Sequence, residues 1–282
     1  MINRPNSNSE IDPKSFDTIA KLAYRESGLI LAVEKTSMIQ SRLRHRLKEL
    51  ELPNFELYTD YVCSEQGSVE RKHMISALTT NVSHFFREQH HFDILQKQVR
   101  ETLLPRLQAG DKVRIWSAGC SNGQEALSIA MSLLEISSDI EKLDVKILAT
   151  DIDGEVVRFA TNALYPERFV SGVPSMLLDK YFTEELTKTE RVYLAKANLR
   201  SLISFKELNL LANWPMNRKM DIIFCRNVVI YFDQKTQNDL WPRFRQLIDD
   251  EGLLFLGHSE RIPEPEKVGF QTSGPTAYKP IC

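Results

Sequence analysis

Apolar residues recur every three or four positions over the first part of the chain, which is the spacing of one face of an α-helix. One stripe consists of Phe16, Ile19, Ala20 and Ala23, and a second consists of Ile39, Leu43, Leu47 and Leu50. No segment before residue 88 has a convincing strand pattern. We therefore predict a small all-α domain over residues 13–88, preceded by a polar leader over residues 1–12 that is expected to be flexible.

From residue 89 onward, short apolar runs alternate with segments of helical spacing. The apolar runs predict strands at 113–117, 145–150, 220–225 and 253–257, and the other segments predict helices at 124–136, 153–163 and 233–250. Alternating strands and helices are typical of a mostly parallel sheet with helices on both faces. The fold class expected for residues 89–282 is therefore α/β. Pro242 lies inside the last predicted helix and is expected to kink or break it.

Residues 165–205 interrupt this alternation, because the segment is longer than a connection between a strand and a helix needs. It contains a helical piece, a charged turn and two β-like runs, at 191–195 and 202–205. We interpret the whole segment as a small β-rich insert in the α/β domain.

The turn after the first predicted strand indicates a nucleotide site. An apolar run ends at Gly119, a loop of small residues leads to Gly123 and a helical run, and the next predicted strand ends at Asp151. Strand, glycine turn, helix, strand and acid is the plan of a nucleotide-binding α/β domain. The glycines lack the spacing of a dinucleotide loop, and the loop has no P-loop lysine. It therefore suits a nucleoside without phosphate, such as S-adenosylmethionine; the alternative is a glycine turn in an unrelated α/β domain.

Composition excludes several classes of function. With 282 residues and 42% hydrophobic content the chain can bury a sizeable core, and a net charge of −2 argues against nucleic-acid binding by bulk charge. None of the four cysteines stands at C-x-x-C spacing and the histidines match no ligand pattern, so we expect no metal and a reducing compartment. We find neither an apolar run of about 20 residues nor a signal-peptide pattern, and expect a cytoplasmic protein that does not insert into membranes.

One predicted helix in the first domain is strongly basic. Between Lys35 and Lys48 there are five Lys or Arg residues and no acid, the others being Arg42, Arg44 and Arg46. On a helix the last four form two i,i+4 rows that flank the apolar stripe. The rows are either an ordinary solvated face or a surface for an acidic partner, and the lack of acids favours the partner.

Two further segments carry candidate chemistry. Phe85 and Phe86 are expected to plug a core or a domain interface and to hold Arg87, whose planar guanidinium can bind a carboxylate; the alternative is a surface pair between Arg87 and Glu88. A second polar pair, residues 226–227, directly follows a predicted strand, where parallel sheets bind their ligands.

Six segments, in this order, resemble the chemotaxis receptor glutamate O-methyltransferase family, whose substrates are the methyl-accepting chemotaxis proteins. The segments are Asn81–Glu88, Ala118–Glu125, Thr150–Asp153, Asn209–Leu211, Phe224–Phe232 and Gly257–Glu260. The resemblance covers roughly residues 15–280. It implies a helical N-terminal domain joined to a Rossmann-like, S-adenosylmethionine-dependent methyltransferase domain with a small β-rich insert.

The resemblance also implies roles for individual residues. The implied cofactor contacts are Asn81, Ser83, Arg87, Glu125, Asp151, Asn209, Leu210, Arg226 and Asn227. Among these, Asp151 is expected to hold the ribose, the 209–210 step the adenine, and Glu125 and Arg87 the methionine end. Tyr231 is expected near the transferred methyl group, and we assign Arg87 and Tyr231 as the catalytic residues that orient the substrate.

The basic helix is the surface that the resemblance implies for the acidic methylation helices of the receptor, with Arg42, Arg44, Arg46 and Lys48 as substrate-binding residues. The turn at 183–191 of the insert lacks the glycine that some relatives have where they hold a receptor tail peptide by strand addition. That tether is therefore doubtful for this chain.

The implied reaction is methyl transfer from S-adenosylmethionine to glutamate side chains of chemotaxis receptors, which gives glutamyl methyl esters and S-adenosylhomocysteine and serves sensory adaptation. Glutamate has a pKa of about 4.3, so it is ionised at neutral pH and needs no general base. Two alternatives remain. One is a methyltransferase of the same fold that acts on another substrate, and the other is a non-catalytic adaptor that only binds the cofactor.

Overall fold

The computed structural model describes residues 10–187 and 190–281. The chain forms two compact units: one contains the residues up to Thr80 together with Tyr231–Asp233, and the other contains Asn81–Ile230 and the residues from Gln234 onward. Residues 1–9 of the expected leader lie outside the described residues. Within the described part of the chain, no helix combines the length and the apolar composition needed to cross a bilayer.

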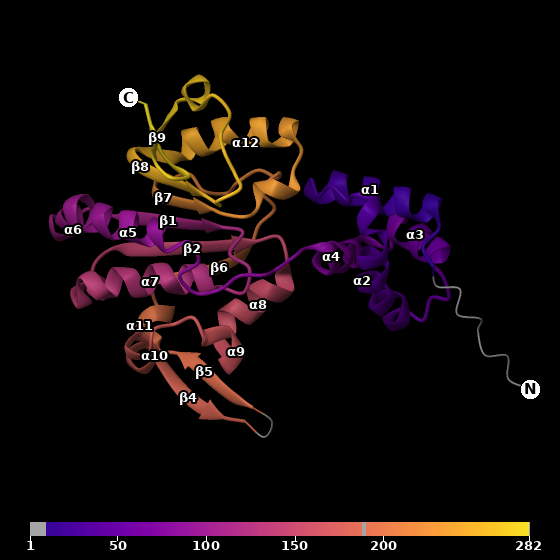
Figure 1. The fold of residues 1–282 in the computed structure, drawn as a ribbon, viewed down its shortest axis with the longest axis horizontal. Coiled ribbons are helices and arrows are strands. Elements are labelled where there is room, and N and C mark those ends of the chain that lie inside the picture. The colour runs from indigo at the N-terminus through magenta and orange to yellow at the C-terminus, as the bar shows by residue number, and fades with distance from the viewer. Residues whose placement is uncertain (1–9, 188–189, 282) are drawn as a thin grey trace, which may run out of the picture. The chain divides into compact units, whose positions relative to one another are not determined.

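The first unit is helical, as the apolar spacing predicts (Figure 1). Its helices are α1 (Pro13–Ser27), η1 (Val33–Lys35), α2 (Thr36–Glu49), α3 (Phe55–Cys63) and α4 (Ser68–Leu78). Asp12 starts α1 by accepting a hydrogen bond from the Ser15 N–H at 2.9 Å, and Gly28 ends it in a left-handed conformation with φ of 71°. The predicted stripe of α2 is buried at Ile39, Leu43 and Leu47.

The second unit is built on a seven-stranded sheet in the order β6-β2-β1-β7-β8-β10-β9. The strands are β1 (Val113–Ala118), β2 (Val145–Asp151), β6 (Ile203–Glu207), β7 (Met220–Cys225), β8 (Ile248–Leu256), β9 (Phe270–Gly274) and β10 (Ala277–Pro280). The five strands from β6 to β8 pair in parallel, and only β10 and β9 add antiparallel pairs at one edge. The predicted, mostly parallel α/β fold is confirmed.

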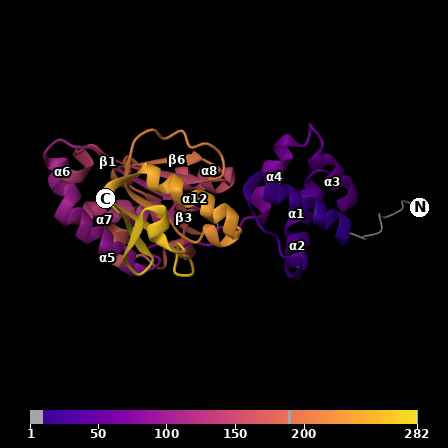
Figure 2. The same ribbon diagram turned by 90° about the horizontal axis from the view of Figure 1, so that it is seen from above.

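Helices lie on both sides of this sheet. Figure 1 shows α12 above β7 and α7 below β1 and β2, and Figure 2 shows the same elements from above. The helices are α5 (Gln89–Gln98), η2 (Val99–Leu103), α6 (Leu104–Gln108), α7 (Gln124–Ile136), η3 (Ser138–Lys142), α8 (Gly154–Asn162), η4 (Val229–Tyr231), α12 (Gln234–Leu247) and η5 (Pro265–Val268). Trp116 of β1 packs against Phe244 of α12, while the neighbouring Ile115 lies in the large core cluster that contains the apolar side chains of α7. Pro242 does not break α12, which continues as an α-helix through it.

The insert is a three-stranded antiparallel sheet in the order β3-β5-β4. Its elements are β3 (Leu164–Pro166), α9 (Glu167–Val170), α10 (Ser175–Tyr181), β4 (Phe182–Leu186), β5 (Arg191–Ala195) and α11 (Ala197–Arg200). The expected insert over 165–205 is too long at its end, because residues 203–205 belong to β6, which pairs with β2 in the main sheet. An apolar run alone does not show which sheet it joins. Residues 188–189 of the insert's turn lie outside the described residues.

The boundary between the units also differs from the expected position after residue 88. Phe85 is 2% exposed and belongs to the core of the second unit, where its ring contacts Tyr165 and Phe182 edge-on at 5.5 and 5.8 Å between centroids. The segment Asn81–Glu88 therefore belongs to the second unit. Sequence spacing could not reveal this, since an apolar pair is equally suited to either core.

Candidate cofactor site

The loop after β1 has a tight, glycine-dependent path. Gly119 and Gly123 both have φ of 84°, a region that side chains disfavour. A Cβ at Gly119 would lie 2.2 Å from Cγ2 of Val228, so this position excludes any larger residue. The N–H groups of Gly119 and Cys120 donate to the Thr150 carbonyl oxygen at 2.7 and 2.8 Å. The loop is thereby held against the carboxyl end of β2.

Asp151 ends β2 directly beside this loop. One carboxylate oxygen accepts a hydrogen bond from the Ser121 N–H at 2.8 Å and the other accepts one from the Asp153 N–H at 3.0 Å. Burial raises the pKa of Asp151, and these backbone hydrogen bonds oppose the rise. Each carboxylate oxygen has a second lone pair. Asp151 thus has the chemistry and the fixed position to accept the two hydroxyls of a ribose.

The predicted adenine step lies next to the predicted ribose acid. The Leu208 N–H donates to the Asp151 carbonyl oxygen at 2.8 Å, which joins the ends of β6 and β2. Asn209 turns its Oδ1 to the Leu211 N–H at 2.9 Å, and Leu210 is buried at 7% exposure. The fold therefore brings the 209–210 step and Asp151 to adjoining strand ends at the carboxyl edge of the sheet.

A line of charged residues, with Arg226 buried and Glu88 and Glu125 half-buried, lies at the start of α7. Glu125 accepts a hydrogen bond from the Ser117 hydroxyl at 2.7 Å, and its other oxygen lies 3.3 Å from Nη1 of Arg226. Nη2 of Arg226 lies 3.3 Å from Oε2 of Glu88 and donates to the Arg87 carbonyl oxygen. Burial raises the pKa of Glu125, and the guanidinium of Arg226 opposes that rise. Arg226 is thus a fixed cation between two acids.

This environment changes the expected role of Arg226. Its side chain is 2% exposed, so it is covered rather than presented to a ligand. We interpret it as the residue that favours the charged form of Glu125 and holds that side chain in place, with Glu125 as the group that can contact the cofactor.

Arg87 is half-buried and donates from Nη1 to the Val82 carbonyl oxygen at 3.1 Å. The alternative of a surface pair with Glu88 is not what the structure contains, because Glu88 pairs with Arg226 and accepts hydrogen bonds from N–H and Nδ1 of His258 at 3.0 and 2.9 Å. The contact with Val82 leaves the rest of the Arg87 fork available for an anionic group.

The segment before Arg87 is tied to the glycine loop and to two helix starts. Nδ2 of Asn81 donates a hydrogen bond to Asp153 at 2.7 Å, and the carbonyl oxygen of Asn81 accepts one from the Ser121 hydroxyl at 3.1 Å. The Ser83 carbonyl oxygen accepts from Nε2 of Gln124 at 3.2 Å. Asn81 and Ser83 therefore border the same loop as Asp151 and Glu125, and their contact with the cofactor stays a prediction.

Two residues hold this region together in roles that the sequence analysis does not assign, although both lie in segments that carry the resemblance. Asp153 is 3% exposed and caps α8 by accepting from the Glu155 N–H at 2.9 Å while its other oxygen holds Asn81. Its position before a helix start is an N-cap signal that could have found it. Glu260 is 3% exposed and binds backbone N–H groups of the loop after β7. That contact joins distant segments and has no local signal.

Tyr231 belongs to the helical unit. Its carbonyl oxygen accepts from the Ile30 N–H at 3.1 Å, and near it the Tyr24 hydroxyl donates to Asp233 at 2.7 Å. The expected position of its hydroxyl beside the transferred methyl group stays a prediction.

The expectation that the whole basic row of α2 faces solvent is wrong for two of its members. Arg46 binds the buried Glu70 through two nitrogens, at 2.9 and 2.6 Å, and is itself 16% exposed. Arg42 caps the end of α4 by donating to the Leu78 and Thr79 carbonyl oxygens at 2.9 and 2.8 Å. Both side chains therefore stabilise the helical unit. The exposed members of the row are Arg44 and Lys48.

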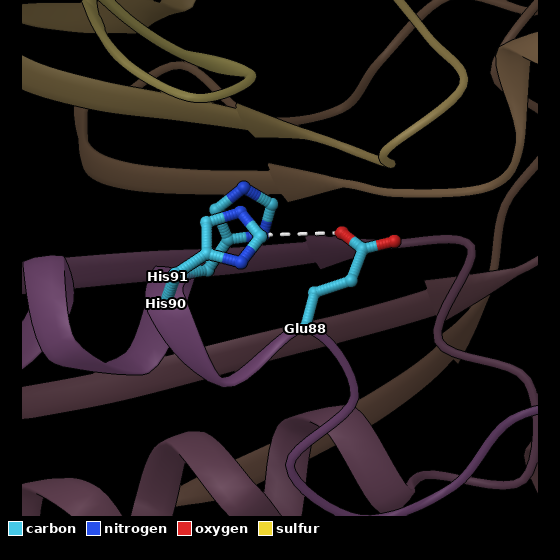
Figure 3. A group of neighbouring side chains, drawn as sticks. All are labelled: Glu88, His90 and His91. Carbon is cyan, nitrogen blue, oxygen red and sulfur yellow. Dashed lines mark ion pairs between the residues drawn. The ribbon is translucent and has the colours of Figure 1, made fainter.

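Glu88, His90 and His91 each offer an atom that could bind a metal ion, and these atoms lie within 4.8 Å of one another (Figure 3). Arg226, however, already places its guanidinium 3.3 Å from Glu88, and this fixed charge repels a second cation. Burial and the charge of Arg226 lower the pKa of His91 to about 4, so its ring is neutral at pH 7. His91 bonds through Nε2 to the Thr276 hydroxyl at 2.9 Å, whereas Oε2 of Glu88, Nε2 of His90 and Nδ1 of His91 have no hydrogen-bond partner among the described residues. We interpret this group as a packed cluster beside Arg226, and the expected absence of a metal stays a prediction.

Comparisons with known proteins agree with this geometry. The family model described as "CheR methyltransferase, SAM binding domain" matches residues 81–278, and the one described as "CheR methyltransferase, all-alpha domain" matches residues 14–79. The chain is 41% identical to a probable chemotaxis protein methyltransferase of Rhizobium etli, over 92% of this chain and 96% of the relative. It is 37% identical to a chemotaxis protein methyltransferase of Escherichia coli, over 93% of this chain and 89% of the relative.

A solved structure of PKMT2 from Rickettsia typhi in complex with AdoHcy aligns with 51% of this chain and 20% of its own, at 14% identity and a TM-score of 0.32. That likeness is too low to carry an argument. The two family models, by contrast, cover nearly all described residues, one on each unit. The chain therefore belongs to the CheR methyltransferase family, with an all-α domain followed by an S-adenosylmethionine-binding methyltransferase domain.

Proposed function

We propose that this methyltransferase transfers methyl groups to glutamate side chains of chemotaxis receptors and forms glutamyl methyl esters. The names of the relatives, chemotaxis protein methyltransferases, support receptor methylation. The observation that carries the cofactor half of the proposal is the carboxyl edge of the sheet, where the glycine loop, Asp151 and the 209–210 step adjoin. A glutamate carboxylate is an acceptor that is already ionised at neutral pH, so the proposed reaction requires no general base.

The residues of the site divide the work of holding the cofactor, which supplies an electrophilic methyl group on a positive sulfur. Asp151 would accept the ribose hydroxyls, and the buried wall of Leu210 would contact the adenine. Glu125 would face the ammonium of the methionine part, and the guanidinium of Arg226, 3.3 Å away, favours its ionised form. Catalysis is then chiefly positioning of the acceptor carboxylate in line with the reacting bond.

Arg87 is the candidate for orienting that carboxylate. Its guanidinium keeps donors available beside the single contact to Val82. A strong ion pair to the substrate would stabilise the ground state as well as the transition state, so we assign Arg87 orientation rather than tight binding. Tyr231 is proposed to share this role.

The receptor would be recognised partly by charge. Arg44 and Lys48 are the exposed members of the basic row of α2, and they suit acidic helices of a receptor's cytoplasmic part. A substrate of that kind would place the enzyme in the cytoplasm.

The test uses the full chain, cofactor with a labelled methyl group and cytoplasmic fragments of chemotaxis receptors. Label that mild alkali releases as methanol, on peptides containing glutamate, supports the proposal. Label that resists alkali would instead favour a methyltransferase of the same fold with another acceptor, and calorimetry without cofactor binding would favour the adaptor. The Arg87→Ala variant should lose single-turnover rate, and an unchanged rate would remove its proposed role.

A further inference from the structure

A buried carboxylate from one loop holds the backbone of another at the carboxyl edge of the sheet. Glu260, which follows β8, is 3% exposed. Its Oε2 accepts hydrogen bonds from the N–H groups of Asn227 and Gly257, at 2.8 and 2.6 Å. Its Oε1 accepts from the N–H of Ile230 at 3.1 Å. One side chain thus ties the loop after β7 to the loop after β8.

The loop after β7 follows an unusual path. Asn227 has φ of 60°, in the left-handed region, which asparagine adopts more readily than most other residues. A Cβ added to Gly257 would lie 2.5 Å from Nδ2 and 2.8 Å from N of Asn227, so the two loops are as close as glycine allows. Two directed hydrogen bonds from this loop to one buried carboxylate, from the N–H groups of residues 227 and 230, hold this conformation in place.

The carboxylate is held by backbone dipoles rather than by a cation. In the part of the chain that the structure describes, no salt bridge to Glu260 is found. Burial raises its pKa, and the backbone N–H groups oppose that rise. Burying a carboxylate costs free energy unless hydrogen-bond donors surround it. The Glu260 carboxylate therefore requires the N–H groups of the loop to stay in place, and it holds them there in turn.

We propose that Glu260 is a positioning residue for the cofactor: by holding the N–H groups of residues 227 and 230, it fixes the loop that carries Asn227 and Arg226. The inference rests on the proposed function, through the cofactor contact that the family resemblance implies for Asn227 and through the position of Arg226 beside Glu125. Glu260 itself touches neither cofactor nor substrate in this assignment.

The variant Glu260→Gln tests the inference, because the amide keeps the size of the side chain but turns an NH₂ group toward an N–H donor. Losing a hydrogen bond to a charged group is expected to raise the dissociation constant for S-adenosylhomocysteine, measured by calorimetry, at least about tenfold. Hydrogen exchange at residues 225–231 should become faster in the same variant. The KM for the cofactor should rise more than kcat falls.

Asp221→Asn is the matched control. Asp221 is 4% exposed near the start of β7, where it accepts hydrogen bonds from the Arg114 N–H and from Nη1 of Arg106, both at 2.7 Å. The Asp221→Asn variant therefore removes a buried carboxylate at the end of β7 opposite to the loop that Glu260 holds. Its melting temperature should fall, while its affinity for S-adenosylhomocysteine should stay within about twofold of the wild type.

The outcomes separate the two proposals. Wild-type affinity in the Glu260 variant, or equal losses of affinity in both variants, would overturn the positioning role. Failure of the wild-type protein itself to bind S-adenosylhomocysteine would overturn the proposed function, and the inference with it. Should Glu260→Gln not fold, Glu260→Asp keeps the charge but falls short of the three N–H groups, and an unaltered affinity in that variant would refute the inference in the same way.

Discussion

The ion pair between Arg46 and Glu70 gives the sharpest test of the helical unit, because it shows which part of the basic helix is structural. Glu70 is 3% exposed and accepts from two nitrogens of Arg46 and from the Tyr58 hydroxyl at 3.0 Å. Replacing Arg46 with Ala leaves a buried carboxylate without its cation. Breaking a buried pair in this way costs about 3–5 kcal/mol. We expect the lower end of that range, since Tyr58 still donates.

A loss of about 3 kcal/mol is large for a unit of this size. Each kcal/mol lowers the melting temperature by about 4–8 °C in a domain of about 60–100 residues, so we expect a fall of at least about 12 °C. Circular dichroism at 222 nm follows the helices of both units. All three tryptophans, Trp116, Trp214 and Trp241, lie in the second unit, so their emission reports that unit alone.

The expected result is an early loss of helical signal in Arg46→Ala that the tryptophan emission does not share. Arg44→Ala, on the exposed side of the same helix, is the control and should change the midpoint by less than about 3 °C. Replacing both Arg46 and Glu70 with Met should recover much of the loss, because no unpaired charge remains. A single variant that melts like the wild type would refute the reasoning.

Three further predictions concern charge. The double variant Arg44→Glu, Lys48→Glu should weaken binding of receptor fragments in a pull-down titration while leaving affinity for S-adenosylhomocysteine unchanged; a parallel loss of both would indicate misfolding instead. Burial raises the pKa of Glu125 above 4.5, so the contribution of this carboxyl group to stability falls as pH rises through the raised value. The variant Glu125→Gln should therefore keep or raise the melting temperature at pH 7, yet weaken cofactor binding. A lower melting temperature with intact binding would contradict both the stability argument and the proposed cofactor contact. Burial lowers the pKa of His91 from 6.5 to about 4, so the free energy of unfolding should drop by roughly 3 kcal/mol as pH falls through that window. Urea titrations at several pH values should show a smaller drop for His91→Asn than for the wild type. An equal dependence on pH in both proteins would show that His91 does not titrate in this way.

The sequence by itself determined the elements and the chemistry that their ends carry. The helical stripe of α2, the parallel strands β1, β2 and β7, and the helix α7 all lie where apolar spacing places them. Spacing is informative there because the helix α2 buries one face and shows a stripe, whereas a strand such as β7 is buried on both faces and appears as a continuous apolar run. The sequence also indicates Gly119, Gly123 and Asp151, because a glycine turn and an acid at a strand end are local features.

Only the tertiary structure decided which charged side chains form buried ion pairs and which stay exposed. In the sequence, Arg46 and Arg44 are equivalent members of one basic row, yet Glu70 on another helix buries the first and leaves the second exposed. For Arg226 the sequence predicts a ligand contact but contains no sign of its two acidic partners, Glu88 and Glu125. Pairing between distant residues depends on which surfaces meet, and no local pattern contains that information.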